Sequence, residues 1–356
     1  MRKNSNVTIP EALQESSSIA IPTQTEIAIR HQHTGYVAGV DIGGTNLRMA
    51  LADMSGNILV KTSSSTTGVR DPQFVIQRMY EGLKQMFSQI AASPDALKSI
   101  AIGVPGITNV DDGTVIATSY LMGWQNVPLR ALLEEELQIA AAIDNDVNLA
   151  AIGECWTGAA KDVRDFVFLA IGTGLGAGIV LNGRPYRGNN WSAGEIGYMF
   201  VPGTSAGPKQ AGQPGALESA IGGEGIKLRW EKRRDATLPE NLNATEIFDF
   251  ALNGDSLAEA ILQESATLLA QTIYNISLVL DCPLFVLGGS VGMHPALCDA
   301  TQKILGQWKR RGRLHVVRSA LGGDAQLMGA IRVALDTANA NWKSANNWLN
   351  HDQAST

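Results

Sequence analysis

The sequence predicts a two-lobed α/β fold, and three observations lead to it. The chain has 356 residues, which suits two lobes better than one small domain. Short apolar runs typical of strands alternate with longer segments of helical periodicity. A strand, a glycine-rich turn and a second strand occur in that order twice, over residues 36–52 and 166–181. Two such hairpins facing each other could grip one polyphosphate from both sides.

Composition and charge exclude several classes of function. Apolar residues make up 45% of the chain, which supports a sizeable core, and the formal net charge is −6. This acidic balance gives no electrostatic footprint for nucleic acid or for an anionic membrane surface. The longest apolar runs fall short of the roughly 18 residues that a membrane-spanning helix needs. We therefore expect neither a nucleic-acid partner nor a membrane partner.

The cysteines and the first residues bear on the compartment. Cys155, Cys282 and Cys298 lie far apart and have no metal-ligand spacing, which suits a reducing environment. Arg2 and Lys3 are not followed by an apolar segment, so no signal peptide is expected. We expect a cytoplasmic protein.

The first glycine-rich turn has the features of a phosphate site. Residues 36–52 are typical of a hairpin with Gly43 and Gly44 at its tip. Because glycine has no Cβ, the backbone N–H groups of such a turn can approach a phosphate. Thr45 adds a hydroxyl donor, and Asp41 at the strand end could hold a hydrated Mg²⁺ against the same phosphates. The alternative is a plain hairpin in which Asp and Gly serve only the turn.

A second candidate site follows the short strand expected over residues 140–143. A helix is expected from Val147 to about Trp156, so Asn145 and Asp146 lie where a strand gives way to a helix. Ligands of open α/β sheets bind at that edge. A carboxylate there could take the proton from a substrate hydroxyl that attacks a phosphorus atom. The alternative is capping of the helix by Asp144 or Asp146.

Two further glycine-rich segments follow strands. The strand at residues 166–171 leads into the glycine-rich residues 172–178, and a strand is expected at 179–181. Because a strand and not a helix follows, this segment does not fit a dinucleotide-binding fingerprint. The strand at 283–287 leads into a third glycine-rich turn, residues 288–292, which could lie against a nucleotide base and ribose.

Two glutamates, Glu195 and Glu218, are candidate acceptors for sugar hydroxyls, because carboxylates make strong charge-assisted hydrogen bonds. As isolated residues they would be solvated loop acids. Periodicity and turn residues assign the rest of the chain. The expected elements are a strand at 58–60, a helix at 71–91, a strand at 99–104, a loop with turns at 105–106 and 112–113, helices at 128–137 and 257–279, a strand at 314–317 and a helix at 324–336.

With these motifs in order, the chain resembles the ROK family of sugar kinases and sugar-responsive repressors over about residues 36–338. The matching stretches are residues 41–46, 103–106, 123–129, 145–148, 172–176, 193–197 and 288–289. Any one of them is weak, whereas the seven in register are specific. The resemblance implies an actin-like ATPase (ribonuclease H-like) fold, in which two lobes close a central cleft around ATP–Mg²⁺ and a hexose. We also expect a homodimer.

The resemblance implies a role for each candidate residue. Asp146 would be the base for the attacking sugar hydroxyl, and Asp41 would hold Mg²⁺ through water or phosphate. The residues expected to hold the sugar are Asn145, Glu195, Tyr198, Glu218 and Gly106. Those expected to hold the nucleotide are Asp41, Gly43, Gly44, Thr45, Asn46, Gly172, Thr173, Gly174, Gly288 and Gly289.

The expected activity is ATP-dependent transfer of the γ-phosphate to a hydroxyl of a hexose or hexose derivative. Two alternatives are a sugar-binding regulator without a DNA-binding domain and a scaffold that has lost catalysis. The retention of Asp41 and Asp146 favours the kinase. Polyphosphate in place of ATP remains open, as does the identity of the sugar.

The sequence departs from the family at its zinc site. A His usually follows Glu-x-Gly, where it contacts the sugar and binds zinc, but Tyr198 stands here. The cysteines of the family's zinc loop are absent from residues 209–218, although its glycines and Glu218 remain. Neither Ala nor Lys can replace a thiolate in a tetrahedral zinc site, so no zinc is expected. The family's Asn before Gly-Trp is also missing, with Tyr120 near its place.

Domain boundaries follow from these assignments. Residues 36–146 are expected to form a small lobe and residues 147–323 a large lobe. The helix at 324–338 is expected to pack back on the small lobe. Residues 1–35 are polar, too short for a helix-turn-helix module, and are expected to form a flexible extension. Residues 339–356 are expected to be a polar tail.

Overall fold

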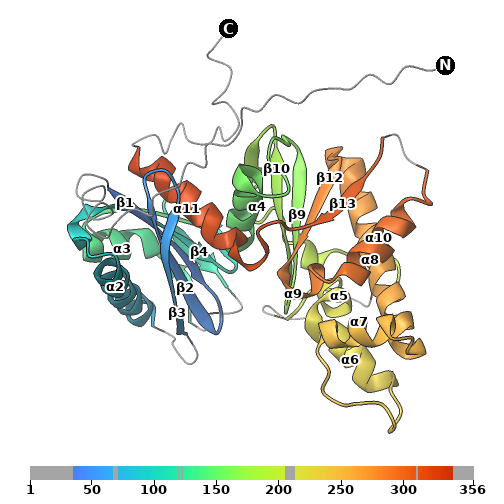
Figure 1. Ribbon diagram of the computed structural model, residues 1–356. Helices are drawn as coiled ribbons and strands as arrows, with labels where there is room; N and C mark the ends of the chain where they lie inside the picture. The colour runs from blue at the N-terminus through green and yellow to red at the C-terminus, as the bar shows by residue number, and fades with distance from the viewer. Residues whose placement is uncertain are drawn as a thin grey trace, which may run out of the picture. The chain divides into compact units, whose positions relative to one another are not determined.

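The computed structural model describes residues 35–66, 71–118, 121, 123–204, 213–309 and 312–339. Two five-stranded sheets form its framework (Figure 1). The first has the order β3-β2-β1-β4-β8 and the second the order β11-β10-β9-β12-β13. The bounds of these strands are β1 (Tyr36–Ile42), β2 (Asn46–Asp53), β3 (Ile58–Ser65), β4 (Leu97–Val104), β8 (Ala140–Asn145), β9 (Phe166–Ile171), β10 (Leu175–Leu181), β11 (Arg184–Tyr186), β12 (Leu284–Gly288) and β13 (His315–Arg318).

The two sheets repeat one topology. In the first sheet, β1, β2 and β3 pair antiparallel, whereas β4 is parallel to β1 and β8 is parallel to β4. In the second, β9, β10 and β11 pair antiparallel, whereas β12 is parallel to β9 and β13 is parallel to β12. The carboxyl ends of the parallel strands in each sheet therefore meet at one edge, where ligands of α/β sheets bind.

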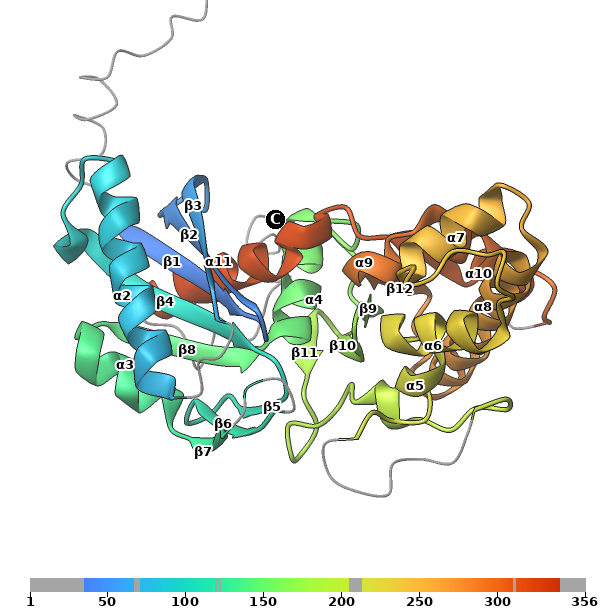
Figure 2. The same ribbon diagram turned by 90° about the horizontal axis from the view of Figure 1, so that it is seen from below.

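Alternation along β1 divides the two faces of the first sheet, because successive side chains of a strand point to opposite faces. Tyr36 and Val40 pack with α2 (Pro72–Gln89) and α3 (Leu129–Leu137) on one face. Val37 packs on the other face with α4 (Asp146–Thr157) and α11 (Ala325–Ala338). Figures 1 and 2 show these two helix pairs on opposite sides of the sheet.

Helix α4 contributes to the cores of both sheets. Its Leu149 and Ile152 pack with the first sheet and with α11. Its Ala150 and Ala151 pack with Phe166 and other residues of the second sheet. Figure 1 shows α4 beside α11 on one side and beside β9 and β10 on the other. The first residue of α4 is Asp146, so both cores fix the start of this helix.

The opposite face of the second sheet carries the largest core. Val167 and Phe285 of the sheet pack there with Leu269 of α8 (Ser256–Leu280) and Leu297 of α10 (Pro295–Leu305). The remaining elements are η1 (Pro94–Ala96), β5 (Ile107–Asn109), β6 (Thr114–Ala117), β7 (Gln125–Val127), η2 (Ile196–Tyr198), α5 (Glu218–Ile221), α6 (Gly223–Arg233), α7 (Ala244–Leu252), α9 (Gly289–Gly292) and η3 (Gly322–Asp324).

A local capping signal placed the start of one helix correctly. The predicted start of α2 is confirmed, because Asp71 accepts a hydrogen bond from the Gln73 N–H and Pro72 is the first helical residue. Asp255 caps the long helix α8 by accepting a hydrogen bond from the Ala258 N–H, a signal that the sequence prediction did not use. Strand β3, in contrast, runs on to Ser65, past its predicted end at residue 60. Its outer half is polar and mostly exposed, so the sequence there gives no apolar signal for a strand.

Of three predicted turns or loops, two are right only in part and one is wrong. The loop expected after residue 104 contains a small antiparallel sheet of order β5-β6-β7, whose strands are too short to show a period-two pattern. The glycine-rich residues 172–178 form a turn only as far as Gly174, because β10 begins at Leu175. Residues 289–292 form the short helix α9 instead of a turn, with the Met293 N–H donating to the Gly289 carbonyl.

The glycines at the start of β10 serve helix packing. A Cβ at Gly178 would lie 2.7 Å from the Ala151 Cβ and 2.7 Å from the Val147 carbonyl oxygen. Both of these contacts belong to α4. The absent side chain therefore lets α4 lie directly on β10. This contact helps to fix the position of Asp146, the first residue of α4.

The predicted division into lobes at residues 146 and 323 stays a prediction. Residues 1–34 and 340–356, which carry the predicted extension and nearly all of the predicted tail, lie outside the described residues. Among the helices of the described residues, none combines the length and the apolarity that a bilayer crossing requires.

Candidate active site

One row of residues crosses the first sheet at the carboxyl ends of its parallel strands. Asp41 of β1 pairs with Gly103 of β4, and Gly103 pairs with Asp144 of β8. A Cβ at Gly103 would lie 3.4 Å from the Asp146 Cα and 3.6 Å from its Cβ. The glycine therefore sits between the strand of Asp41 and the start of α4. This row brings the carboxylates of Asp41 and Asp146, which are distant in the sequence, to one edge of the sheet.

Asn145 caps helix α4. Its Oδ1 accepts hydrogen bonds from the N–H groups of Val147, at 2.8 Å, and Asn148, at 3.1 Å. Its Nδ2 donates to the Gly106 carbonyl at 2.8 Å. The capping alternative, which gave this role to Asp144 or Asp146, is wrong about the N-cap residue, which is Asn145. Oδ1 of Asp146 nevertheless also accepts a hydrogen bond from the Val147 N–H, at 2.9 Å. Asp146 is thus left as the first helical residue.

The charge state of Asp146 is perturbed. Burial, the negative charge of Asp41 and, to a smaller extent, that of Glu195 raise the pKa of Asp146 from 3.8 to about 7, against backbone hydrogen bonds that lower it. The side chain keeps partial exposure. Asp146 therefore lies within electrostatic reach of one carboxylate from the first sheet and of another from the segment after β11.

Asp41 is buried, with 7% of its surface exposed. Its Oδ2 accepts hydrogen bonds from Nε of Arg48, at 2.9 Å, and from Nη2, at 2.5 Å. Burial raises the pKa of Asp41, and the charge and hydrogen bonds of Arg48 oppose that rise. Within the part of the chain that the structure describes, Asp41 is therefore a buried carboxylate paired with one cation, Arg48.

The two predicted phosphate turns share a hydrogen-bonding pattern. In the first, the Gly43 N–H donates across the turn to the Asn46 carbonyl at 2.7 Å. In the second, the Gly172 N–H donates to the Gly174 carbonyl at 3.0 Å. Within the described residues, no acceptor is found for the next two N–H groups of either turn, which belong to Gly44, Thr45, Thr173 and Gly174. Both turns can therefore offer backbone donors to an anion.

Glu218 lies beside the second turn. Its Oε2 accepts a hydrogen bond from the Leu175 N–H at 2.8 Å, and Leu175 directly follows the turn. The Gly223 N–H donates to the Gly172 carbonyl at 2.7 Å. The carboxylate and the phosphate turn are therefore joined, although they are far apart in the sequence.

Tyr198 and Glu195 belong to the same group of side chains. Burial and the charge of Glu218 raise the pKa of Glu195. Burial and the charges of both glutamates raise the pKa of Tyr198, whose surface is 44% exposed. The Leu217 N–H donates to the Gly197 carbonyl at 3.1 Å, which joins the two segments. The three predicted sugar-side groups thus lie together.

Gly288 and Gly289 lie next to the second turn as well. A Cβ at Gly289, whose φ is +77°, would lie 2.4 Å from the Ile171 carbonyl oxygen. The nearest atoms to a Cβ at Gly172 are Oγ and N of Ser290, at 3.9 and 4.0 Å. The start of α9 therefore packs against the end of β9 and its turn.

Comparison with known proteins identifies the family of the chain. The model of the ROK family matches residues 37–337. This chain belongs to the ROK family. A glucokinase of Halalkalibacterium halodurans is 31% identical over 266 residues, which cover 72% of this chain and 80% of the relative. An N-acetylmannosamine kinase of Escherichia coli is 29% identical over 293 residues, which cover 82% of this chain and 95% of the relative.

A solved structure confirms the fold class of this ROK chain. The ROK hexokinase of Thermus thermophilus superimposes with a TM-score of 0.69 at 27% identity, over 87% of this chain and 99% of the hexokinase. The predicted actin-like α/β fold is confirmed by this likeness and by the repeated sheet topology.

Sequence reasoning missed two arginines of the ROK chain. Arg48 faces Asp41 directly across the β1–β2 pair, and the register of the hairpin contained that signal, because opposite residues of antiparallel strands pair. Arg187 forms an ion pair with Asp144. It follows β11, and nothing in the local sequence marks its distant partner.

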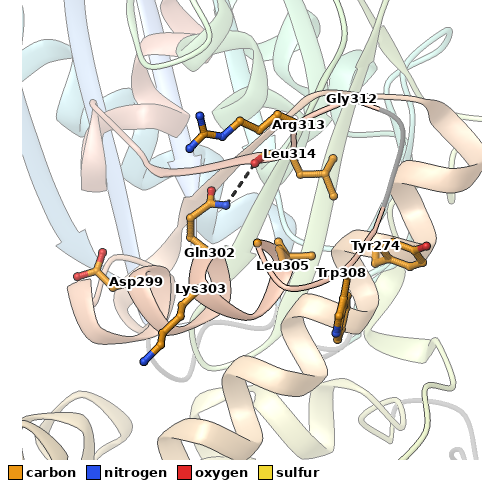
Figure 3. Close-up of a pocket in the computed structure, with 10 residues that line it drawn as sticks. Tyr274, Asp299, Gln302, Lys303, Leu305, Trp308, Gly312, Arg313 and Leu314 are labelled. Atoms are coloured by element: carbon orange, nitrogen blue, oxygen red, sulfur yellow. Dashed lines mark hydrogen bonds between the residues drawn. The ribbon is translucent and has the colours of Figure 1, made fainter.

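A pocket among the described residues lies away from these groups. It has a volume of about 690 Å³ between α8, α10 and the segment before β13 (Figure 3). Gln302 donates to the Leu314 carbonyl within it. Its lining contains none of the candidate residues, so it does not mark the candidate site. The lining residues are Tyr274, Asp299, Gln302, Lys303, Leu305, Gly306, Trp308, Gly312, Arg313 and Leu314.

The expected absence of zinc stays a prediction. Residues 209–212 of the altered loop and Tyr120 lie outside the described residues. Within the described part of the chain, no cluster of three or more His, Cys, Asp or Glu side chains could hold a metal ion. A hydrated Mg²⁺ needs less, because one or two carboxylates and the substrate phosphates suffice.

Proposed function

We propose that this chain transfers the γ-phosphate of ATP to a hydroxyl of a hexose or hexose derivative, with Asp146 as general base. The chain is an ATP-dependent carbohydrate kinase, the class to which its named kinase relatives belong. The observation that carries the proposal is the environment of Asp146, whose pKa of about 7 reflects burial and the charges of Asp41 and Glu195.

A base of this strength suits the reaction. A sugar hydroxyl must lose its proton as it attacks the γ-phosphorus, and a base is most effective when its pKa lies near the working pH. An ordinary carboxylate is a weaker base by about three pKa units. Asp146 begins α4, whose position is fixed by contacts with both sheets. It can therefore accept the proton at a defined place.

The residues on the first sheet fit a nucleotide with Mg²⁺. Asp41 uses Oδ2 for Arg48, and within the described residues no hydrogen bond reaches its Oδ1. We assign that oxygen to hydrated Mg²⁺, and the turns at residues 43–46 and 172–174 to the phosphates. When bound, Mg²⁺ neutralises charge on the phosphate oxygens. Residues 288–289 would lie at the base and ribose.

The sugar would be held on the other side of Asp146. We assign its hydroxyls to Asn145, Glu195, Tyr198 and Glu218, with Gly106 positioned by its bond to Asn145. Carboxylates are strong acceptors for hydroxyl donors. Only Oε2 of Glu218 is engaged, by the Leu175 N–H. Within the described residues its other oxygen has no hydrogen bond, so it is available to a ligand.

The alternative of a non-catalytic sugar sensor is not favoured. A sensor needs the groups around Glu195 and Glu218, but it has no use for a carboxylate whose pKa lies near 7. It also has no use for two turns whose backbone donors, within the described residues, have no protein acceptor. A strongly perturbed carboxyl pKa of this kind is typical of catalytic sites.

The test is release of ADP from ATP–Mg²⁺ over a panel of hexoses, N-acetylhexosamines and less common sugars, with polyphosphate as a second donor. The wild type and Asp146→Asn are compared. We expect turnover of one sugar class, reduced about 10²- to 10⁴-fold in the variant, with sugar binding retained in calorimetry.

Asp162→Asn is the matched control, because Asp162 is exposed and undergoes the same chemical change. It should retain full turnover. Near-normal turnover of Asp146→Asn would refute the assignment of the base. Sugar binding without any turnover by the wild type would favour the sensor.

A further inference from the structure

Arg48 holds the carboxylate of Asp41 in an asymmetric way. The two residues are direct partners in the β1–β2 register. Nε and Nη2 of Arg48 both donate to Oδ2, at 2.9 and 2.5 Å, whereas a symmetric fork would engage both oxygens. Among the described residues, no donor reaches Oδ1. The carboxylate is therefore fixed through one oxygen while the other stays available.

The same guanidinium is fixed at its far side. Its Nη1 donates to the Gly323 carbonyl, and its Nη2 lies 3.4 Å from Oε1 of Gln326. Gly323 belongs to η3, and Gln326 is in the first turn of α11. Arg48 thus connects Asp41 to the junction where the chain passes from the second sheet into α11.

Only arginine can make this set of contacts. Its planar guanidinium presents five N–H donors in a rigid fork, whereas the ammonium of lysine is a single nitrogen on a flexible stem. Glutamine carries no charge and offers only two donors. With either substitution, the carboxylate of Asp41 would lose its fixed orientation. Lysine would still neutralise its charge.

We propose that Arg48 is a positioning residue for the metal-side carboxylate. It holds Asp41 by Oδ2, keeps Oδ1 for Mg²⁺·nucleotide, and is itself held by the start of α11. This inference rests on the proposed assignment of Mg²⁺ to Asp41. Groups that orient a ligand of a metal change metal affinity by about 10- to 100-fold when they are removed.

Lys61 provides a matched control within the chain. Its Nζ pairs with Oδ2 of Asp324 at 2.5 Å, and Asp324 is the neighbour of Gly323. The ion pair ties β3 to the same junction but does not involve Asp41. If Arg48 served only to hold the first sheet to this junction, Lys61 would serve the same role.

The experiment measures ADP binding by calorimetry with Mg²⁺ and with EDTA, in the wild type, Arg48→Gln, Arg48→Lys and Lys61→Gln. Arg48→Gln should weaken Mg²⁺·ADP binding about tenfold or more and leave binding in EDTA unchanged. Arg48→Lys should recover part of the loss. Lys61→Gln should bind as the wild type does. If Arg48→Gln fails to fold, Arg48→Lys carries the comparison.

A double-mutant cycle with Asp41→Asn tests whether Arg48 acts through Asp41. In that background, Arg48→Gln should cause no further loss of Mg²⁺·ADP affinity. An additive loss would overturn the proposal. An equal loss in Lys61→Gln, or the same loss in EDTA, would also overturn it and would indicate a structural role.

Steady-state kinetics add a second readout. The KM for Mg²⁺·ATP should rise in Arg48→Gln while the KM for the sugar stays constant. Failure of the proposed function is distinguishable, because the absence of sugar turnover in the wild type leaves the binding comparison intact. If ADP binding by the wild type does not respond to Mg²⁺, the proposal is overturned.

Discussion

Arg187 forms a buried ion pair with Asp144, in which Nη2 lies 2.5 Å from Oδ2. The two side chains are 12% and 1% exposed. Asp144 lies two residues before Asp146, and the Arg187 carbonyl accepts a hydrogen bond from the Ala193 N–H. The pair therefore fixes the segment before Glu195 to strand β8, whose end precedes Asp146. It joins the sugar side to the base.

We expect Arg187→Gln to be strongly destabilising. Removal of one partner leaves Asp144 as a buried charge without a cation, which typically costs about 3–5 kcal/mol. Urea unfolding followed by circular dichroism measures the loss of free energy of unfolding. The additional change Asp144→Asn should recover part of it, because the uncompensated charge is gone.

Arg233→Gln is the control for that experiment. Arg233 pairs with Glu264 at 2.7 Å, but the side chains are 38% and 43% exposed. Exposed pairs contribute about 0–1 kcal/mol, so this variant should unfold almost as the wild type does. A similar loss in both variants would contradict the role of burial at Arg187.

The local motifs of the site could be predicted from the sequence, because each depends on neighbouring residues. The hairpin tip after Asp41 and the strand end before Asp146 are both marked by an apolar run that stops at a polar residue or a glycine. The cap of α4 was assigned one residue away from Asn145. Asp and Asn have similar capping preferences, so composition alone does not decide between them.

The long-range features could not be predicted. Gly178 was interpreted as part of a turn, but it is a strand residue that makes room for α4. Its meaning depends on a helix that packs against it only in three dimensions. Arg187 and Asp144 are 43 residues apart, and no periodicity links them. Tertiary packing settles such positions, and local propensity does not.

The pH dependence of kcat/KM should report Asp146. The base must be ionised to accept a proton, and its pKa is raised to about 7. We therefore expect kcat/KM to rise with pH through about pH 7 as a single ionisation and to level off above pH 8. A rate–pH profile with saturating Mg²⁺·ATP measures this. A rise centred near pH 4 would contradict the assignment.

The stability of Asp146→Asn should depend on pH as well. A carboxyl whose pKa is 3.8 unfolded and about 7 folded keeps its proton in the folded state where the unfolded chain has lost it. Its contribution to the free energy of unfolding therefore falls as pH rises between those values. The variant should gain stability over the wild type at pH 8, and the gain should vanish near pH 4.

The size of that gain follows from the pKa. The shift of Asp146 from 3.8 to about 7, at about 1.36 kcal/mol per unit, sets an upper limit of about 4 kcal/mol. Partial exposure of the side chain reduces it. Melting temperatures at pH 4, 6 and 8 measure the trend, with Asp162→Asn as control. A constant difference at all three pH values would be inconsistent with this origin.

Gly178→Ala should displace α4. The new Cβ would lie 2.7 Å from both the Ala151 Cβ and the Val147 carbonyl, and such overpacking costs about 1–3 kcal/mol. Because Asp146 begins α4, kcat should fall together with the melting temperature. Gly306→Ala is the control, since its Cβ would meet nothing closer than 3.4 Å and its φ is −64°. It should retain stability and activity.

Tyr198→Phe should weaken binding of the sugar and leave binding of the nucleotide unchanged. The phenol hydroxyl lies within electrostatic reach of Glu195 and Glu218, the two carboxylates assigned to the sugar. Loss of one neutral hydrogen bond costs about 0.5–1.5 kcal/mol, so the KM for the sugar should rise about two- to tenfold. Tyr186→Phe removes the same hydroxyl from a ring that is 50% exposed and should change nothing. If the KM for ATP rises instead, Tyr198 belongs to the nucleotide side.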